Sequence, residues 1–483
     1  MTKFDADLAS LKQHQVPQWY EDAKFGIFIH WGLFSIPGFA GSHGSIGDVF
    51  ATQYDLAVAQ TPYTEWYANA IKVPESDSAK HHAAVYGDMP YEDFRAPFLK
   101  GLEQWDPKAW AKLFKQAGAK YVVLVTKHHD GYSLWPTGVR HPKKAGWHTE
   151  RDIVGELGEA VRAEGMRYGL YYSSGIDWSF NKKPLRTLGQ FIGSTPGGRY
   201  PAYAVAQVKE LIDKYKPAVL WNDISWPTPL GKLTEVFAYY YNNVPEGVVN
   251  DRAMPVTFKS WLMRFKYFSD RFDKMAKPRM SGKRRSKGMI PAEPPHYDFR
   301  TPEYVSFPDI QKRKWESTRG MSHSFGFNRA DKDEDYLSVA DIVADFVDAV
   351  SKNGNLLLNI GPRGEDAQIP AAQVARLQGF GAWLARNGEA IYGTRPWVRA
   401  EGATGDELPV RFTRNGETLY AIVLGKPAGG EMTLRDVAVR EGAEIALLGH
   451  GPVAWRKSGG DIVIALPVLD DAPAISFSIS GAA

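Results

Sequence analysis

The 483-residue sequence contains no cysteine. This absence excludes disulfide bonds, thiol nucleophiles, iron–sulfur clusters and zinc sites built from thiolates. No apolar run reaches the roughly 18 residues that a membrane helix needs, and no signal-peptide core is present near the N-terminus. We therefore expect a cytoplasmic protein, or a periplasmic or secreted one if a signal has been removed from the chain.

The sequence also lacks a strong excess of charge. Lys and Arg total 58 and Asp and Glu total 55, which gives a net charge of +3. So mild an excess does not predict nucleic acid or an anionic membrane as the partner. Aromatic residues, in contrast, make up 13% of the chain. Such side chains stack on sugars or bases and also fill large cores, so their number alone does not identify a function.

Short apolar runs that end in polar residues recur along the first part of the chain. Helical patterns separate several of them: Asp106 and Pro107 begin one helix, and Ser338 with Asp341 forms a capping-box pattern before another. The eight candidate strands begin near residues 25, 121, 167, 218, 247, 296, 314 and 355. Buried strands that alternate with helices predict an α/β protein with a parallel (β/α)8-like, TIM-type barrel. An open doubly wound sheet is the alternative, but no glycine-rich phosphate fingerprint follows any strand.

The pattern changes near residue 396. Asn415 and Gly416 form a preferred hairpin turn between two alternating segments, and more short strands follow without a long helix. We expect residues 1–395 to form the barrel-like catalytic domain and residues 396–483 to form an antiparallel β-sandwich. The second domain holds few candidate catalytic residues, so we expect it to support packing or to form a rim of the site.

The predicted strands end in ionisable and hydrogen-bonding side chains, most densely in the motif KHHDG at 127–131. A single histidine near a strand end is usually a satisfied structural group. In a barrel, however, the carboxyl ends of all strands meet at one face, where active sites lie. We therefore expect seven groups from six strands to converge there: His30, His128, His129, Tyr171, Asp223, Arg252 and Glu303.

Two chemistries fit such a cluster. Histidines and an aspartate could bind a metal ion that generates hydroxide, but His128 and His129 are adjacent, and neighbouring side chains of a strand point to opposite faces. The other chemistry is glycoside hydrolysis, in which one carboxylate attacks the anomeric carbon and the other protonates the leaving oxygen. Asp223 and Glu303 are the natural pair for it. The histidines and Arg252 would then bind sugar hydroxyls.

The motifs together resemble a known enzyme family. WYEDAKFGIFIHWGLFSIP, EWYANAI, KHHDGYSLW, GLYYSSGIDW, LWND, WESTRGMSHSFGFN and VSKNGNLLLNIGP occur in the order found in the α-L-fucosidases of glycoside hydrolase family 29. The resemblance spans residue 19 to about residue 395. It implies a barrel-like domain followed by a β-sandwich, no cofactor, a fucosylated glycan or glycoside as substrate, and a retaining mechanism with a covalent fucosyl–enzyme intermediate.

The resemblance also implies roles for individual residues. Asp223 in LWND resembles the family nucleophile, which a non-catalytic fucose-binding protein, the third alternative, would not need. Phe325 and Trp66 could line an apolar pocket for the methyl group of the deoxy sugar. The residues that resemble the family's sugar-binding set are His30, Glu65, Trp66, His128, His129, Tyr171, Trp221, Arg252 and Phe325.

The acid/base has several candidates. Glu303 in HYDFRTPEY resembles the acid/base of one bacterial branch of the family, and Glu293 and Glu316 are its rivals. Glu316 lies in a segment that is more typical of packing. An acid must hold a proton at working pH, which an apolar or carboxylate-rich environment favours.

An extra stretch, residues 256–294, precedes Glu303 and departs from that branch. Its basic part, SGKRRSKG, is typical of a solvated, mobile loop; a lid over the leaving-group site is the second interpretation and a nucleic-acid patch the third. Its aromatic residues predict that its first half is an ordered, partly buried helix: Trp261, Phe265, Tyr267 and Phe268. The glycosidic linkage is not predicted, and a homo-oligomer is compatible with the sequence.

Overall fold

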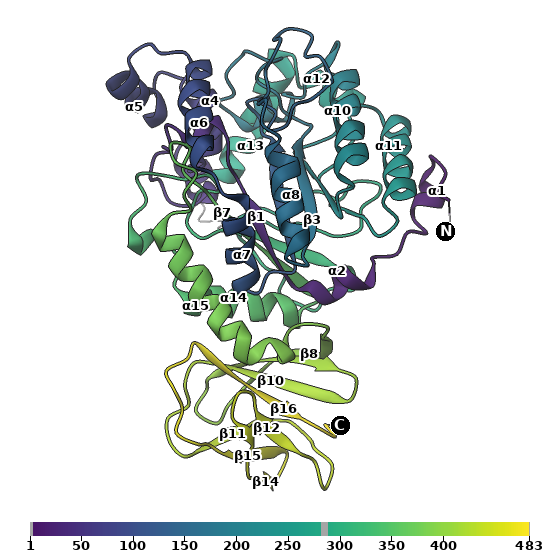
Figure 1. The fold of residues 1–483 in the computed structure, drawn as a ribbon, viewed down its shortest axis with the longest axis vertical. Helices are drawn as coiled ribbons and strands as arrows, with labels where there is room; N and C mark the ends of the chain where they lie inside the picture. The colour runs from purple at the N-terminus through teal and green to yellow at the C-terminus, as the bar shows by residue number, and fades with distance from the viewer. Residues whose placement is uncertain (1–2, 282–287, 483) are drawn as a thin grey trace.

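The computed structural model describes residues 3–281 and 288–482. Its first part is a curled sheet of seven parallel strands surrounded by helices, in the order β5-β4-β3-β2-β1-β7-β6 (Figure 1). Almost every strand residue is buried, because both faces of the sheet are covered. The strands are β1 (Phe25–Ile29), β2 (Tyr121–Lys127), β3 (Arg167–Ser173), β4 (Val219–Asp223), β5 (Val248–Val249), β6 (Trp315–Gly320) and β7 (Gly354–Ile360).

The run from residue 296 is not a regular strand, which corrects the prediction of eight. It bridges the two edge strands instead: Phe299 pairs with Asn250 just after β5, and Arg300 pairs with Trp315 at the start of β6, both in parallel. The ladder is interrupted because Pro302 has no backbone N–H to donate. A short irregular segment therefore joins the edges of the sheet, and the predicted (β/α)8-like fold class is confirmed.

Helices cover the outside of this sheet. As predicted, the Asp106 carboxylate caps a helix, α7, by accepting the N–H groups of Lys108 and Ala109, and Ser338 forms a capping box with Asp341 at the start of α14. The helices are α1 (Leu8–Leu11), α2 (Gln18–Ala23), α3 (Ile46–Thr52), α4 (Tyr67–Ala70), α5 (Asp77–Tyr86), α6 (Arg95–Gly101), α7 (Pro107–Gln116), α8 (Ile153–Ala163), α9 (Leu188–Ile192), α10 (Tyr200–Tyr215), α11 (Leu230–Asn243), α12 (Phe258–Leu262), α13 (Lys266–Met280), α14 (Val339–Ser351) and α15 (Ala371–Asn387). Within the described residues, no helix is both long and apolar enough to span a bilayer.

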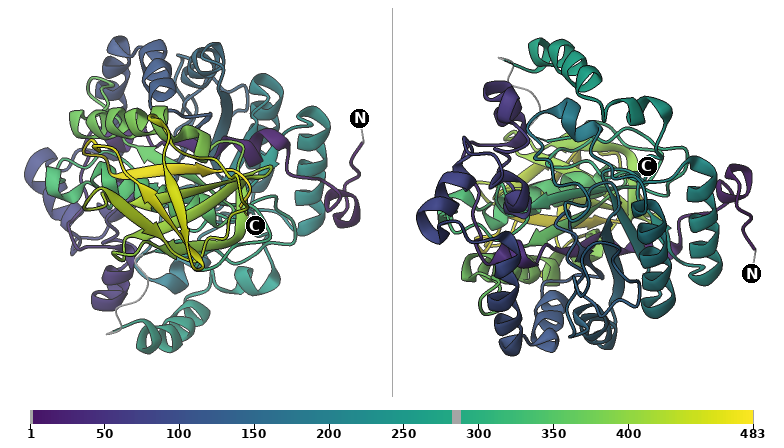
Figure 2. Two further views of the ribbon diagram at one scale, coloured as in Figure 1. Left: turned by 90° about the horizontal axis from the view of Figure 1, so that it is seen from below. Right: turned by 90° about the horizontal axis from the view of Figure 1, so that it is seen from above.

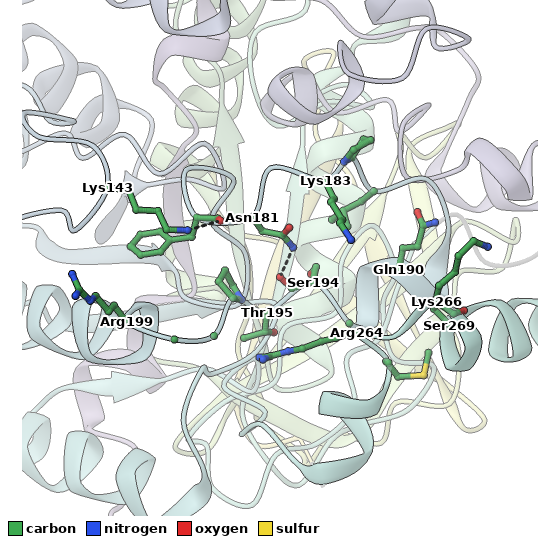
Figure 3. A pocket seen from close by; sticks show the side chains of 18 of the residues that line it. Lys143, Asn181, Lys183, Gln190, Ser194, Thr195, Arg199, Arg264, Lys266 and Ser269 are labelled. Atoms are coloured by element: carbon green, nitrogen blue, oxygen red, sulfur yellow. Dashed lines mark hydrogen bonds between the residues drawn. The ribbon is translucent and has the colours of Figure 1, made fainter.

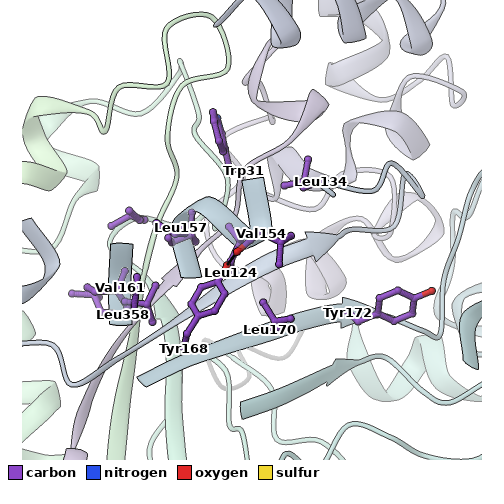
Figure 4. Packing of buried hydrophobic residues seen from close by; sticks show 14 of the residues in the cluster. Trp31, Leu124, Leu134, Val154, Leu157, Val161, Tyr168, Leu170, Tyr172 and Leu358 are labelled. Atoms are coloured by element: carbon purple, nitrogen blue, oxygen red, sulfur yellow. Dashed lines mark hydrogen bonds between the residues drawn. The ribbon is translucent and has the colours of Figure 1, made fainter. Parts of the chain in front are cut away.

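Helix α8 shows how the outer layer is held. Its apolar stripe of Val154, Leu157 and Val161 faces Leu124 of β2 and Leu170 of β3, and all five side chains are fully buried (Figure 4). Burial of each such side chain stabilises the fold by about 1.5–3 kcal/mol. This packing fixes the strands, and hence the loops at their carboxyl ends.

The C-terminal part is built from antiparallel strands. They form a six-stranded sheet, β13-β12-β16-β10-β9-β8, and a three-stranded sheet, β11-β15-β14. The predicted hairpin is present, and Gly416 in its turn has a φ of 58°. The strands are β8 (Arg395–Ala403), β9 (Pro409–Asn415), β10 (Thr418–Leu424), β11 (Glu431–Leu434), β12 (Ile445–Leu447), β13 (Gly451–Pro452), β14 (Trp455–Ser458), β15 (Asp461–Ala465) and β16 (Ala474–Ile479).

These sheets pack under α14 and α15, as the views in Figures 1 and 2 show. The Trp383 indole N–H donates to the carbonyl of Ala474 at 2.9 Å, and Arg395 pairs with Asp22, which precedes β1, at 2.9 Å. The contact therefore lies at the amino ends of the barrel strands. The alternative that this part forms a rim of a site at the carboxyl ends is wrong.

Candidate active site

A narrow cavity of about 120 Å³ opens where the strands of the barrel end. All eleven site residues expected from the sequence line it, although they come from segments as far apart as residues 30 and 325: His30, Glu65, Trp66, His128, His129, Tyr171, Trp221, Asp223, Arg252, Glu303 and Phe325. The motif KHHDG begins with Lys127, the last residue of β2, and its two histidines form part of the wall of this cavity. We refer to the cavity as the pocket.

Asp223 is the last residue of β4, and three donors hold its carboxylate. The backbone N–H of Ile224 donates to Oδ1 at 2.8 Å and Arg252 Nη1 donates to the same oxygen at 3.3 Å. The Tyr171 hydroxyl donates to Oδ2 at 2.7 Å. Because donors hold both of its oxygens, this carboxylate is fixed in orientation.

Arg252 bridges Asp223 and Glu303. Its Nη2 donates to Glu303 Oε2 at 3.1 Å, and Thr301 accepts two more hydrogen bonds from the guanidinium, at 2.9 Å and 3.0 Å. Burial alone would lower the pKa of Arg252, but Glu303 and Asp223 raise it, so the guanidinium is charged. One buried cation therefore orients two carboxylates in the same pocket.

Glu303 has the environment of a group that can hold a proton. Burial raises its pKa, Arg252 lowers it, and the nearby charge of Asp223 raises it again, with a net increase. Its backbone is held by the end of the 256–294 stretch: Met289 and Glu303 exchange two N–H···O bonds of 2.8 Å. Met289 also lines the pocket, so this stretch is part of the site.

The three histidines are neutral. Burial lowers the pKa of His30 and of His129 to about 4 and that of His128 well below its usual value. The Ser173 hydroxyl donates to the carbonyl of Ile176, so it accepts the N–H of His129 Nδ1 at 2.6 Å. This leaves His129 Nε2, 3.9 Å from Asp223, as a hydrogen-bond acceptor.

His30 is fixed in the same way. Asn359 donates its amide N–H to the carbonyl of Phe325 and accepts from His30 Nδ1 at 2.6 Å, so His30 Nε2 is also an acceptor. Two rings thus present acceptors, whereas Arg252 presents a donor. Sugar hydroxyls both donate and accept, so this mixture suits a carbohydrate.

One wall of the pocket is apolar. Trp66 and Phe325 of this wall were expected from the sequence, whereas five further apolar residues were not: Ile46, Phe50, Val58, Leu188 and Phe191. Nothing in their local sequence distinguishes them from core residues, so only the fold reveals them. Glu65 lies beside this wall, where burial raises its pKa to about 7 and its Oε2 accepts the N–H of Gly326 at 3.0 Å.

The two rivals of Glu303 do not line the pocket. Glu316 is fully buried in a cage of neutral donors and accepts hydrogen bonds from Tyr20 (2.8 Å), Tyr121 (2.5 Å) and Trp221 (3.1 Å). Burial raises the pKa of Glu316 to about 7. The Glu293 side chain is 54% exposed.

The described residues contain no group of three or more His, Cys, Asp or Glu side chains placed to hold a metal ion. His128 and His129 both line the pocket, with ring centroids 4.0 Å apart. His129 bonds Ser173 through Nδ1 and His30 bonds Asn359 through Nδ1, so each ring has one nitrogen left for a ligand.

The first half of the 256–294 stretch is helical, as predicted, and forms α12 and α13. Helix α13 is partly buried, through Ser269, but the aromatic side chains on which the prediction rested are 38–67% exposed: Trp261, Phe265, Tyr267 and Phe268. The helix is held instead by a polar contact, described below. Most of the SGKRRSKG motif lies outside the described residues.

Comparison with known proteins identifies the family. The family model for alpha-L-fucosidase matches residues 1–389, and the model for the alpha-L-fucosidase C-terminal domain matches residues 406–476. The tissue alpha-L-fucosidase of Bos taurus is 31% identical over 97% of this chain and 88% of its own length.

Solved structures give the same result. The alpha-fucosidase of Thermotoga maritima in complex with a mechanism-based inhibitor is 38% identical, with a TM-score of 0.82 over 99% of this chain and 100% of its own. Alpha-L-fucosidase isoenzyme 1 from Paenibacillus thiaminolyticus is 27% identical, with a TM-score of 0.67 over 96% of this chain and 98% of its own. The chain belongs to the α-L-fucosidase family of glycoside hydrolases.

Proposed function

We propose that this α-L-fucosidase removes terminal α-L-fucose with retention of configuration, with Asp223 as nucleophile and Glu303 as acid/base. Family membership supports the reaction, and one observation supports the roles: a single buried guanidinium, that of Arg252, bonds both carboxylates in one pocket. A retaining pair needs its carboxyl groups about 5–5.5 Å apart, without room for a water between them. Asp223 and Glu303 both bond the guanidinium of Arg252, so their carboxyl groups lie close together, as a retaining pair requires.

In the first step Asp223 attacks the anomeric carbon while Glu303 gives its proton to the leaving oxygen. The hydrogen bonds from Tyr171 to Oδ2 and from Arg252 to Oδ1 orient the attacking carboxylate, and the acceptor nitrogens of His30 and His129 would bind sugar hydroxyls. Trp66 and Phe325 would pack against the methyl group. Desolvation of that methyl favours a 6-deoxy sugar over one with a hydroxyl there.

The second step needs Glu303 as a base. When Asp223 becomes an ester it loses its negative charge, and with it the influence that raises the pKa of Glu303. The lowering influence of Arg252 persists. The pKa of Glu303 therefore falls in the intermediate, which favours the carboxylate that takes a proton from the attacking water.

Nuclear magnetic resonance during hydrolysis of 4-nitrophenyl α-L-fucoside tests this function. The first-formed product is expected to be α-L-fucose, which later mutarotates. If β-L-fucose forms first, the mechanism is inverting and the paired roles are wrong. The same assay with EDTA separates the metal-hydrolase alternative, for which chelation would abolish turnover.

A further inference from the structure

A cleft of about 800 Å³ lies beside the pocket and is several times larger than it. A second cavity of about 470 Å³ shares Pro142, Lys143 and Arg199 with it and adds Arg140. Among the described residues that line either cavity there is no Asp or Glu. We call the two together the basic groove, after its cationic side chains: Arg140, Lys143, Lys183, Arg199, Arg264 and Lys266.

Most of these cations have no acidic partner. No ion pair within the described residues involves Lys183, Arg199 or Arg264, and the ammonium group of Lys143 donates to the carbonyl of Phe180 at 3.2 Å. Lys266 pairs with Asp270 on its own helix at 2.5 Å. In a chain with a net charge of only +3, this is a strong local concentration of positive charge. A cleft of one charge sign attracts ligands of the opposite sign.

The basic groove adjoins the pocket through α9. Leu188 and Phe191 of this helix line the pocket, whereas Gln190 lines the groove. The Thr195 hydroxyl in the groove lies 2.9 Å from that of Ser225, in the loop directly after Asp223. The two cavities are therefore neighbours that share α9 as a wall, and we infer that a glycan whose fucose occupies the pocket reaches across this wall into the groove.

The wall of the groove is anchored. Asp273 of α13 accepts hydrogen bonds from the Thr187 hydroxyl at 2.6 Å, the backbone N–H of Gly189 at 2.8 Å and the Tyr54 hydroxyl at 2.9 Å. These bonds fasten α13 to the start of α9. Figure 3 shows the result: Lys183 and Arg264 lie on opposite sides of Ser194 and Thr195, with Lys143 and Arg199 toward one end and Lys266 at the other.

We infer that the basic groove binds an anionic substituent, a sulfate ester or a uronate carboxylate, on the glycan that carries the fucose. The inference rests on the proposed function, because it assigns the leaving-group side of the same reaction. A guanidinium matches the planar or tetrahedral oxygens of such groups with paired N–H donors. Nucleic acid fits less well, because single strands need aromatic stacking surfaces, and Phe180 and His141, packed against each other, are the two aromatic rings among the described residues of the groove.

Calorimetric titration with three trisaccharides tests the inference: neutral galactotriose, the same sugar with one sulfate ester, and trigalacturonate. They are titrated into the wild-type protein, into Lys183→Gln/Arg264→Gln, and into Arg271→Gln/Lys274→Gln. The last pair is the matched control, because Arg271 and Lys274 are exposed cations of α13 that do not line the groove. A single-stranded oligonucleotide of equal charge is the fourth ligand.

The wild-type protein is expected to bind at least one anionic trisaccharide and to bind the neutral sugar at least tenfold more weakly. The Lys183/Arg264 variant should lose about tenfold in affinity for the anionic sugar if one of the two cations bonds it, and about a hundredfold if both do, since each charge-assisted hydrogen bond is worth about a factor of ten. The control should stay within twofold. Binding should weaken as salt is added. Whichever of the two anionic trisaccharides binds more tightly shows whether the groove prefers a sulfate ester or a carboxylate.

Equal binding of the neutral and anionic sugars would overturn the inference, as would unchanged binding by the Lys183/Arg264 variant. Tighter binding of the oligonucleotide than of either saccharide would also overturn it. Hydrolysis of 4-nitrophenyl α-L-fucoside by the wild-type protein tests the proposed function separately. If this neutral substrate is cleaved and no anionic sugar binds, only the inference about the groove fails.

Discussion

Two layers inside the barrel hold buried carboxyl groups, and their partners differ in kind. In the pocket, Asp223 and Glu303 are bonded by the cation Arg252. In the cage beneath, Glu316 is bonded by the neutral hydroxyls of Tyr20 and Tyr121 and by the Trp221 indole. A cationic partner favours the charged form, whereas burial among neutral donors shifts the balance toward the protonated form.

Trp221 joins the two layers. Its N–H donates to Glu316, and the Arg252 guanidinium carbon lies 4.8 Å from the centre of its ring. The cage can therefore fix the position of the aromatic surface on which the catalytic cation rests. The comparison separates two uses of a buried carboxylate: reaction in the pocket and support in the cage. Substitutions in the two layers should accordingly affect different measurements.

Asp223→Gly should have the largest effect on turnover. Removal of the attacking carboxylate is expected to lower kcat for an aryl α-L-fucoside by about 10⁴-fold, as for other catalytic nucleophiles. The cavity left by the side chain admits a small anion, so azide should restore turnover and give β-L-fucosyl azide. Rates and products are measured with and without azide, and unfolding curves of both proteins control for stability. A variant that retains its rate would contradict the nucleophile assignment.

Glu303→Gln should cost about 10²–10⁴-fold with substrates whose leaving group needs a proton. With an activated aryl fucoside the first step needs no acid, so the formation of the fucosyl–enzyme should stay fast. The basic limb of the pH–rate profile, which reports the acid, should disappear. A series of fucosides with leaving groups of increasing pKa, measured in single-turnover experiments, gives both results.

Glu65→Gln is the matched comparison for Glu303→Gln. Glu65 also lines the pocket, and burial raises its pKa to about 7, so it is a competing proton donor that the sequence did not reveal. We expect this variant to lose activity equally on all leaving groups, because Glu65 would bind the sugar rather than the leaving oxygen. If the rate of Glu65→Gln instead falls more steeply than that of the wild-type protein as the pKa of the leaving group rises, Glu65 is the acid.

Glu316→Gln should alter stability and its pH dependence. Burial raises the pKa of Glu316 to about 7 in the folded state, above the value of about 4.3 for an unfolded chain. Its contribution to stability is therefore fully present below about pH 4.3 and is lost as the pH rises through 7, by about 3 kcal/mol. The variant lacks this titration. The stability advantage of the wild-type protein should thus shrink by that amount between about pH 4.5 and 7.5.

Urea unfolding of both proteins at several pH values measures this difference, in which all other titrating groups cancel. An advantage that does not change with pH would show that Glu316 has the same pKa in the folded and unfolded chains. Turnover should respond less than in the Asp223 and Glu303 variants. A leaving-group-dependent loss of activity in Glu316→Gln would show that the two layers are not separate in function.

The sequence revealed those parts of the fold and site that local patterns specify. The capping residues of α7 and α14, seven strands and the polar residues at strand ends could be predicted, because each rests on nearby residues. The segment after residue 296 looked like a strand, but Pro302 and the need to bridge two edges prevent a ladder. The aromatic residues of α12 and α13 indicated a partly buried helix, but they are themselves 38–67% exposed, since composition does not show which helix face meets a neighbour.

The remaining features of the site depend on contacts between distant segments. The pairing of Met289 with Glu303, the protonation state of His129 and the basic groove each join residues that no motif connects. Burial sets the pKa values of Glu65 and Glu316, and burial follows from the tertiary fold alone. For this reason the sequence could name the carboxylates but could not rank them.

Glu293→Gln should have the smallest effect of these substitutions on both activity and stability. Glu293 belongs to neither layer: its half-exposed side chain pairs with Arg300 at 3.0 Å and accepts from the Tyr297 hydroxyl at 2.6 Å. Exposed ion pairs contribute about 0–1 kcal/mol, so stability should change by no more than that, and kcat/KM should stay within about twofold. Steady-state kinetics on activated and unactivated fucosides checks this. A leaving-group-dependent loss would mean that Glu293 moves into the pocket when substrate binds and that Glu303 is its support.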